Sequence, residues 1–323
     1  MSGLHEVNRR RDRRANVCAA LVMTAVAVWL LFQHQDGADN SEMDSALVAR
    51  LAPGMKKTVT GMTHDTLGAL ALQDANQPLA SVTGREALEL NIEILRRGYE
   101  MLESIPTYTA TFFRQERVDQ IVTPAQVMQM KVRHQPFSVY LKWLVGSKGS
   151  KGREVLFVDG QRDNRMLVKL GGWKSRLIPS MKIEPCGSVA MRDSRYPVTE
   201  IGMLNLCRKL LDDRQLDLER GEAVLCRLRH DAQHDARSCY LFELEYATSQ
   251  FGEYRKSVQY IDKQWGLPVS IQNFTWPADN CDVSDDTSTL LESYSFSDVR
   301  FNGQLRDSAF DRKNSQYGFY SHR

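Results

Sequence analysis

The sequence predicts an α+β fold, in which helices cover one face of a single curved antiparallel sheet. Three observations support this prediction. A long amphipathic helical pattern comes first, runs of alternating apolar and polar residues follow, and a helical stretch divides these runs into two groups. Strand runs with segregated helices are typical of α+β domains. One apolar segment near the N-terminus precedes the domain and predicts a single transmembrane span.

The N-terminus combines positive charge with an apolar run. Arginine fills most positions from 9 to 14, and Val17 to Phe32 follows without a charged residue. This order is typical of a secretory signal or a signal anchor. Because positive charge stays in the cytoplasm, residues 1–16 are expected to form a basic cytoplasmic tail and residues 17–32 a transmembrane signal anchor. A cleaved signal is the alternative, although the residues after Phe32 provide no good cleavage site.

A spacer is predicted between the anchor and the folded domain. Residues 33–83 show weak periodicity and are interpreted as flexible, with a short helix around Met43–Leu51. Ordered structure is expected over residues 84–323. Thr83 and Glu86 have the spacing of a capping box, which predicts the start of a helix. The helix carries an apolar stripe and should end before Pro106. The stripe consists of Leu88, Ile92, Leu95, Tyr99 and Leu102.

After Pro106 the periodicity changes from helical to two, which predicts strands with one apolar face. The alternating runs are Tyr108–Phe112, Met128–Val132, Phe137–Trp143, Arg153–Val158 and Arg165–Leu170. A glycine- and lysine-rich turn, Gly146–Gly152, lies among them. Ile178–Pro197 contains three prolines and predicts an irregular crossing, after which Thr199 could cap a helix running to about Asp213. Further strands are expected at Glu222–Arg229, Arg237–Tyr246, Tyr254–Asp262, Pro268–Trp276 and Leu290–Phe301.

Two cysteines fall in neighbouring predicted strands. Cys226 and Cys239 would lie opposite each other if the hairpin folded about the middle of the polar stretch His230–Ala236. An exported domain experiences oxidising conditions, so the sequence predicts a cross-strand disulfide between them. Two free buried thiols are the alternative.

The common motifs of catalysis and metal binding do not occur. Lys151 stands where a Walker loop needs its second glycine, and there is no G-x-S-x-G nucleophile motif. His230 and His234 are interpreted as loop histidines, and the aspartates from Asp279 to Asp286 lack the glycine of an EF-hand. Basic and acidic residues nearly balance, which argues against nucleic-acid binding. We therefore expect no enzyme activity, no cofactor and no metal.

Large apolar residues concentrate on one face of the predicted sheet. They are Phe112, Met128, Met130, Val139, Trp143, Phe242, Leu244 and Tyr246. One interpretation is that they line an apolar cavity between sheet and helices, where methionines would adapt to a ligand. The other is an ordinary core packed by the two helices. Glu116, Arg117 and Arg195 lie near strand or loop ends and could form a polar rim of such a cavity or structural ion pairs.

Several phrases identify a family resemblance. YTATFFRQERV, MKVRHQPFSVYLKWL, GREVLFVDG, SRYPVTEIGMLNL and LLESYSFSDVRFN resemble an uncharacterised bacterial exported family, domain of unknown function 1571, from about Arg85 to Tyr320. The element order also resembles periplasmic lipoprotein carriers and receptors of the LolA/LolB type. In those proteins a helix leads into a pattern that Tyr108, Ala110, Phe112 and Gln115 match loosely, although Gln115 is out of phase. This second resemblance implies a LolA-like incomplete β-barrel whose apolar cavity holds acyl chains.

Taken together, the sequence predicts a membrane-anchored periplasmic protein that binds a lipid or an acylated protein. It would be a single-pass protein of the inner (cytoplasmic) membrane, attached through residues 17–32, with its C-terminal domain in the periplasm or outside. The alternative is an envelope protein-interaction or stress-sensing module without bound lipid. A fixed anchor suits a receptor or a sensor better than a shuttling carrier.

Overall fold

The computed structural model describes residues 41–52, 82–172, 178–277, 286–301, 303 and 305–319. The predicted cytoplasmic tail (1–16), the predicted anchor (17–32) and most of the predicted spacer lie outside these residues. Within the described ranges, no helix is both long enough and apolar enough to cross a membrane.

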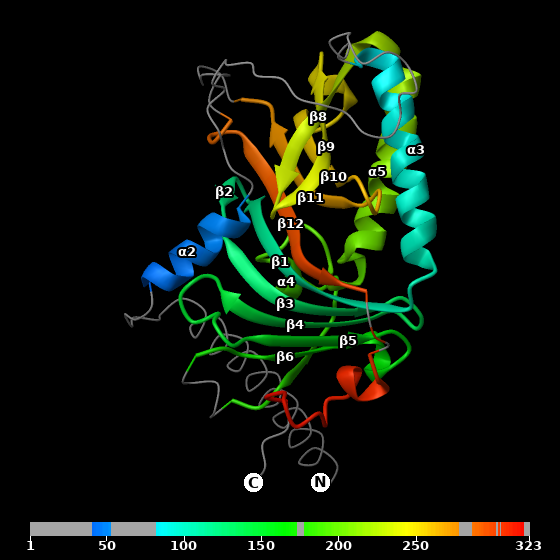
Figure 1. Cartoon of the computed structure of the whole chain (residues 1–323). Coiled ribbons are helices and arrows are strands. Elements are labelled where there is room, and N and C mark those ends of the chain that lie inside the picture. Colours follow the sequence, from blue (N-terminus) through cyan, green and yellow to red (C-terminus); the bar gives the residue numbers. More distant parts are fainter. Residues whose placement is uncertain are drawn as a thin grey trace, which may run out of the picture. The chain divides into compact units, whose positions relative to one another are not determined.

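The strands form one curved antiparallel sheet that does not close into a barrel (Figure 1). They are β1 (Thr107–Val118), β2 (Ile121–Val122), β3 (Gln126–Arg133), β4 (Ser138–Val145), β5 (Glu154–Val158), β6 (Met166–Lys169), β7 (Met181–Ile183), β8 (Val224–His234), β9 (Arg237–Tyr246), β10 (Tyr254–Asp262), β11 (Pro268–Thr275) and β12 (Leu290–Arg300). Their order across the sheet is β7-β6-β5-β4-β3-β1-β12-β11-β10-β9-β8, and β2 pairs with β1. The predicted α+β class and the open, curved antiparallel sheet are confirmed.

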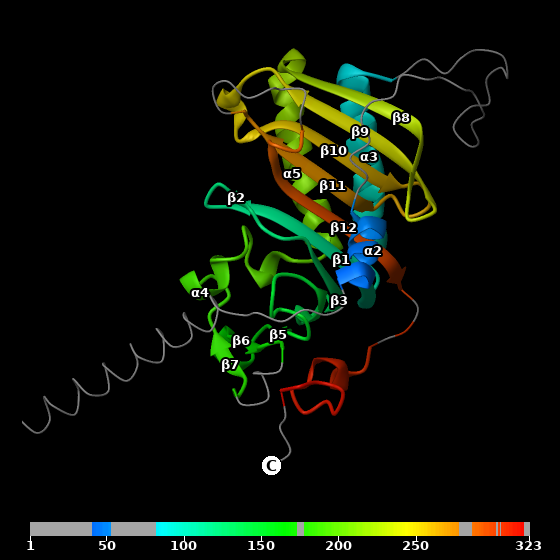
Figure 2. The same cartoon turned by 90° about the vertical axis from the view of Figure 1, so that its left-hand side faces the viewer.

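Two long helices, α3 (Gly84–Glu103) and α5 (Met203–Arg220), lie side by side over the half of the sheet formed by β8 to β12 (Figures 1 and 2). The predicted stripe of α3 faces this half, and its four aliphatic members are buried. The prediction that Thr199 caps this helix is wrong, because α5 begins at Met203. Thr199 lies in a short 3₁₀ turn, and Gly202, with a φ of 113°, interrupts the helical backbone before α5 begins.

The predicted capping box is also not observed. The side chain of Thr83 makes no capping hydrogen bond to α3. Thr83 instead forms an isolated antiparallel bridge with Arg227 of β8, and the backbone N–H of Leu228 donates to the carbonyl of Val82. Pairing with the sheet edge thus replaces local capping at this helix start.

Residues 184–202 cross the concave face between β7 and α5, and we call them the crossing segment. They contain only one helical turn, α4 (Ser188–Met191), and the 3₁₀ turn Val198–Glu200. Tyr196, Val198 and Ile201 pack against the same core cluster as the concave residues of β1, β3, β4 and β5. The crossing segment therefore supplies cover for the part of the sheet that lies away from the long helices.

The outer, convex face carries three smaller clusters, and two of them contain segments from the ends of the described chain. Helix α2 (Ser41–Leu51), which matches the short helix expected in the spacer, buries Leu51 against Phe113, Val127 and Val145. The hydroxyl of Ser295 donates to the carbonyl of Leu51 over 2.8 Å. Residues 305–319 cover the outer face of β4, β5 and β6, with Phe310 and Tyr317 in the cluster. Segments from both ends of the described chain thus protect the convex face.

The predicted disulfide between Cys226 and Cys239 is wrong. Both thiols are free and buried. The hairpin turns at Asp235 and Ala236, both with positive φ, because β8 continues to His234 instead of ending near Arg229. In this register Cys226 faces Leu244, and Cys239 faces Ala232. Six positions along a strand separate the two thiols by roughly 20 Å, far beyond disulfide reach.

Candidate functional site

The eight residues predicted to line a cavity share one face of the sheet, as their alternation indicates. They are Phe112, Met128, Met130, Val139, Trp143, Phe242, Leu244 and Tyr246, and all of them belong to the main core cluster. None is more than 8% exposed, and none borders the pocket described below. The ring of Phe112 stacks on that of Phe296 with centroids 4.9 Å apart. The structure therefore places these side chains in the packed core.

Tyr246 has a polar partner that the alternation pattern does not reveal. Its hydroxyl accepts a hydrogen bond from Arg214 Nη2 over 2.9 Å and donates to Asp217 Oδ2 over 3.1 Å. Arg214 and Asp217 of α5 are themselves buried and 2.7 Å apart. Burial of these charges is tolerated because each has a charged or hydroxyl partner. Tyr246 thus ties the second half of α5 to β9.

The three predicted rim residues meet in the structure. The backbone N–H of Arg195 donates to Glu116 Oε2 over 3.0 Å, and Arg195 Nη1 donates to the carbonyl of Arg117 over 3.3 Å. Arg195 also donates to Glu292 Oε2 over 3.1 Å and contacts the carboxylate of Glu253. The contacts join the crossing segment to β1 and β12.

The carboxylates beneath Arg195 are almost completely buried. Glu116 and Glu292 are each 2% exposed. Glu292 accepts hydrogen bonds from Tyr254 and Asn273 as well as from Arg195, and Glu116 accepts one of 2.6 Å from Tyr294. Burial raises the pKa of Glu292, while the Asn273 amide and the charge of Arg195 counteract the rise. Both carboxylates have several protein partners, so the network holds the crossing segment against the sheet.

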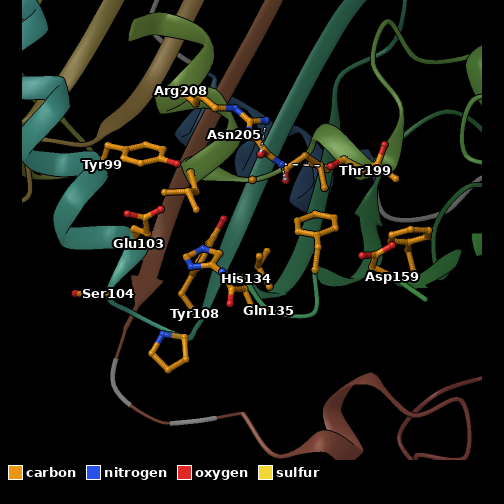
Figure 3. Close-up of a pocket in the computed structure, with 17 residues that line it drawn as sticks. Tyr99, Glu103, Ser104, Tyr108, His134, Gln135, Asp159, Thr199, Asn205 and Arg208 are labelled. Atoms are coloured by element: carbon orange, nitrogen blue, oxygen red, sulfur yellow. Dashed lines mark hydrogen bonds between the residues drawn. The ribbon is translucent and has the colours of Figure 1, made fainter. Parts of the chain in front are cut away.

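A separate pocket of about 610 Å³ opens at one end of the concave face, and we call it the end pocket (Figure 3). It lies between the end of α3, the start of α5, and the adjoining ends of β1, β3 and β5. Its lining comprises Tyr99, Glu103, Ser104, Pro106, Tyr108, Val132, His134, Gln135, Phe137, Phe157, Asp159, Thr199, Ile201, Gly202, Leu204, Asn205 and Arg208. The volume lies within the usual range for small-molecule sites.

The pocket is amphipathic, with an apolar floor and a polar mouth. Tyr108, Val132 and Phe157 on its floor are each at most 2% exposed. Partly buried Ile201 and Leu204 continue the apolar wall. The exposed rim carries both signs of charge, and its polar members are Glu103, Ser104, Gln135, Asp159 and Arg208. An apolar interior with a polar mouth suits a molecule with one apolar and one polar end.

Tyr108 and Gly202 set the shape of the pocket wall. The Tyr108 hydroxyl accepts a hydrogen bond of 2.8 Å from the backbone N–H of Met203, the first residue of α5. A Cβ at Gly202 would lie 2.9 Å from that hydroxyl, so glycine permits both the close approach and the positive φ. Burial keeps the pKa of Tyr108 far above its ordinary value, so the hydroxyl remains neutral.

His134 is the histidine that lines the pocket. Its ring lies 5.8 Å from that of Tyr108, centroid to centroid. Burial lowers the pKa of His134, although the carbonyl of Ile105 and the charge of Glu103 partly offset this effect. The ring is therefore mostly neutral at pH 7. Among the described residues, no three His, Cys, Asp or Glu side chains gather closely enough to hold a metal ion.

No sequence pattern predicts this pocket. Of its lining residues, Tyr99 belongs to the predicted helical stripe, Pro106 to the predicted end of that helix, Tyr108 to an alternating strand and Thr199 to a predicted helix cap. The pocket arises because the crossing segment turns into α5 just beyond the ends of β3 and β5, and no local pattern encodes that contact.

The fold and the pocket together define an open antiparallel half-barrel with an amphipathic site at one end. The chain belongs to the DUF1571 family, described as proteins of unknown function, and the match covers residues 105–319. This confirms the family resemblance found in the sequence. A search of the curated proteins found no match.

Solved structures with similar folds include a lipoprotein, a two-protein complex and a LolA superfamily protein. The lipoprotein LppX of Mycobacterium tuberculosis is 10% identical with a TM-score of 0.40, and the alignment covers 68% of this chain and 98% of that one. A MucA/MucB complex of Pseudomonas aeruginosa is 16% identical, TM-score 0.38, over 68% and 60%. A LolA superfamily protein of Nitrosomonas europaea is 9% identical, TM-score 0.28, over 68% and 96%. The superfamily that the sequence resembles is thus among the structural neighbours.

Proposed function

We propose that this protein binds an amphiphile, either a lipid or an acylated protein, with an acyl chain in the end pocket and the polar part at the rim. The observation that carries the proposal is the pocket itself, which combines a buried apolar floor with an exposed rim of mixed charge. The site differs from the cavity expected from the sequence, because the eight residues expected to line that cavity belong to the buried core cluster and none of them lines this pocket.

The energetics favour a chain-like ligand. Each methylene removed from water contributes about 0.8 kcal/mol, so a few methylenes at the apolar wall give measurable affinity. The rim offers Arg208 to an anionic group and Glu103 or Asp159 to a cationic one. We propose binding without catalysis, because the sequence contains none of the common catalytic motifs.

We further propose that the protein is held in the inner membrane through residues 17–32, with the folded domain on the periplasmic side. The basis is the order of arginine run and apolar segment in the sequence. A reporter enzyme fused after Val82 should be found active on the exported side of the membrane. A fusion that is active only in the cytoplasm would exclude this topology.

Two leucines of the same helix test the pocket. Leu204 lines it, whereas Leu216 is 49% exposed and lies farther along α5. We expect Leu204→Arg to weaken binding of a fluorescent fatty acid to the full chain by about tenfold to a hundredfold, because it replaces apolar contact with a charge. Leu216→Arg should bind like the unmodified protein. Equal binding by both variants, with both folded by circular dichroism, would overturn the proposed site.

The alternative function, a protein-interaction or stress-sensing module without lipid, has its own structural support. Strand β8 (Val224–His234) lies at an edge of the sheet, and its exposed residue Leu225 is apolar. Besides β9, the described residues pair with β8 only through Thr83 and Val82. Such an edge can accept a further strand from a partner. Partner capture that survives Leu204→Arg and fails with a proline in β8 would favour this module.

A further inference from the structure

Two side chains of opposite charge lie on the helix side of the end pocket. Glu103 is the last residue of α3, and Arg208 lies in the second turn of α5. Both side chains are exposed and line the pocket (Figure 3). Leu204 of the apolar wall lies four residues before Arg208, so these two side chains share one face of α5. A ligand chain that packs on Leu204 therefore brings its polar end to Arg208.

Neither Glu103 nor Arg208 forms an ion pair with any residue that the structure describes. Glu103 acts on the ring of His134 through its charge, and Arg208 donates to the neutral amide of Asn205. Other charged side chains of the two helices do pair with a neighbour. These pairs are Arg85–Glu89, Glu93–Arg96, Glu93–Arg97 and Lys209–Asp213. The two charges at the pocket are therefore available to a ligand.

Asn205 orients the guanidinium group of Arg208. Arg208 Nη2 donates to Asn205 Oδ1 over 3.1 Å. The amide of Asn205 is oriented in turn, because its Nδ2 donates to the carbonyls of Thr199 and Ile201, each over 3.3 Å. A contact with a neutral amide leaves the positive charge of Arg208 uncompensated. A guanidinium group held in this way loses less freedom when it binds an anionic group.

The spacing of the two charges suits one dipolar group. Cys207 Sγ donates to the carbonyl of Leu95 over 3.3 Å, which places this part of α5 level with Leu95 of α3. Arg208 directly follows Cys207, and Glu103 lies eight residues beyond Leu95 on α3. At 1.5 Å per residue, their Cα atoms are roughly 12 Å apart along the helix axes. Two charge-assisted hydrogen bonds of about 3 Å each leave room for a small head group between them.

We propose that the end pocket selects a lipid with a zwitterionic head, of the phosphoethanolamine type, over a lipid whose head is only anionic. This inference rests on the proposed binding of an amphiphile in the same pocket. Arg208 contacts the phosphate, and Glu103 contacts the ammonium group. A purely anionic head meets Arg208 but is repelled by Glu103 and by Asp159, the rim carboxylate that follows β5. A zwitterionic head has a partner for each of its charges.

Competition between two lipids on the full chain tests this selection. Lysophosphatidylethanolamine and lysophosphatidylglycerol with the same acyl chain are offered in equal amounts, and native mass spectrometry measures the ratio bound. We expect the unmodified protein to retain about tenfold more of the ethanolamine lipid, and Glu103→Gln to bring the ratio close to one. Arg208→Gln should weaken binding of both lipids by about tenfold. Glu86→Gln and Arg97→Gln are the matched controls, because both residues are exposed on α3 and neither lines the pocket.

Equal retention of the two lipids by the unmodified protein overturns the selection and leaves the amphiphile proposal standing. An unchanged ratio in Glu103→Gln, or a ratio lost in Asp159→Asn but not in Glu103→Gln, overturns the role of Glu103. If neither lipid is retained, or if Leu204→Arg retains both unchanged, lipid binding in the end pocket fails and this inference fails with it. A partly unfolded variant lowers both bound amounts and keeps their ratio, because both lipids compete for the same folded molecules.

Discussion

Arg195→Met removes the cation that fastens the crossing segment to the sheet. Arg195 donates to Glu292 Oε2 over 3.1 Å and contacts Glu253, and its backbone N–H donates to Glu116. Methionine keeps much of the side-chain length and lacks the charge. The substitution therefore leaves the backbone contact to Glu116 possible while Glu292 loses its cationic partner.

The expected cost follows from the burial of Glu292, which is 2% exposed. Breaking a buried ion pair by removing one partner costs about 3–5 kcal/mol. The side chain of Arg195 is 19% exposed, so water can partly replace it, and we expect the lower end, about 3 kcal/mol. Adding Glu292→Gln removes the stranded charge and should restore at least about 1 kcal/mol of that loss.

Urea unfolding of the full chain measures these differences, with Arg97→Met as the control. Arg97 is exposed on α3, and its substitution should change stability by at most about 0.5 kcal/mol. Hydrogen exchange should also accelerate in residues 192–202 of Arg195→Met. If this variant is as stable as the control, or if Glu292→Gln restores nothing, the ion pair does not fasten the crossing segment.

Three further substitutions or reactions probe the packing. Met130→Arg should abolish cooperative folding, because Met130 is 1% exposed in the core; a folded variant by near-UV circular dichroism would contradict its core assignment. Gly98→Ala should cost about 1–3 kcal/mol in urea unfolding, because a Cβ there would overlap a backbone carbonyl; an unchanged midpoint would argue against that contact. Maleimide at pH 8 should label exposed Cys186 but neither Cys226 nor Cys239, since burial raises their pKa values to about 12 and about 11; rapid labelling of either buried thiol would refute this.

The periodicity of the sequence predicts most of the sheet. Alternation in β1, β3, β4 and β9 assigns the buried face correctly, because a strand places successive side chains on opposite sides. It cannot distinguish a ligand cavity from a core, since both require apolar side chains on one face. That distinction depends on how closely the crossing segment and the helices pack against Phe112, Met130 and their neighbours.

Tertiary contacts explain the features that sequence reasoning missed. The hairpin of β8 and β9 continues through polar residues to a two-residue turn at Asp235 and Ala236, so polarity did not mark the turn. Glu116 and Arg195 meet although 79 positions separate them in the chain. The end pocket likewise depends on three segments whose meeting is set by topology.

Native mass spectrometry of the full chain, purified in lipid nanodiscs, tests the binding proposal most directly. We predict that the unmodified protein retains an amphiphile with at least one acyl chain, and that Leu204→Arg loses it while Leu216→Arg keeps it. A ligand-free unmodified protein, or an amphiphile retained equally by Leu204→Arg, would contradict the assignment of the end pocket as a lipid site.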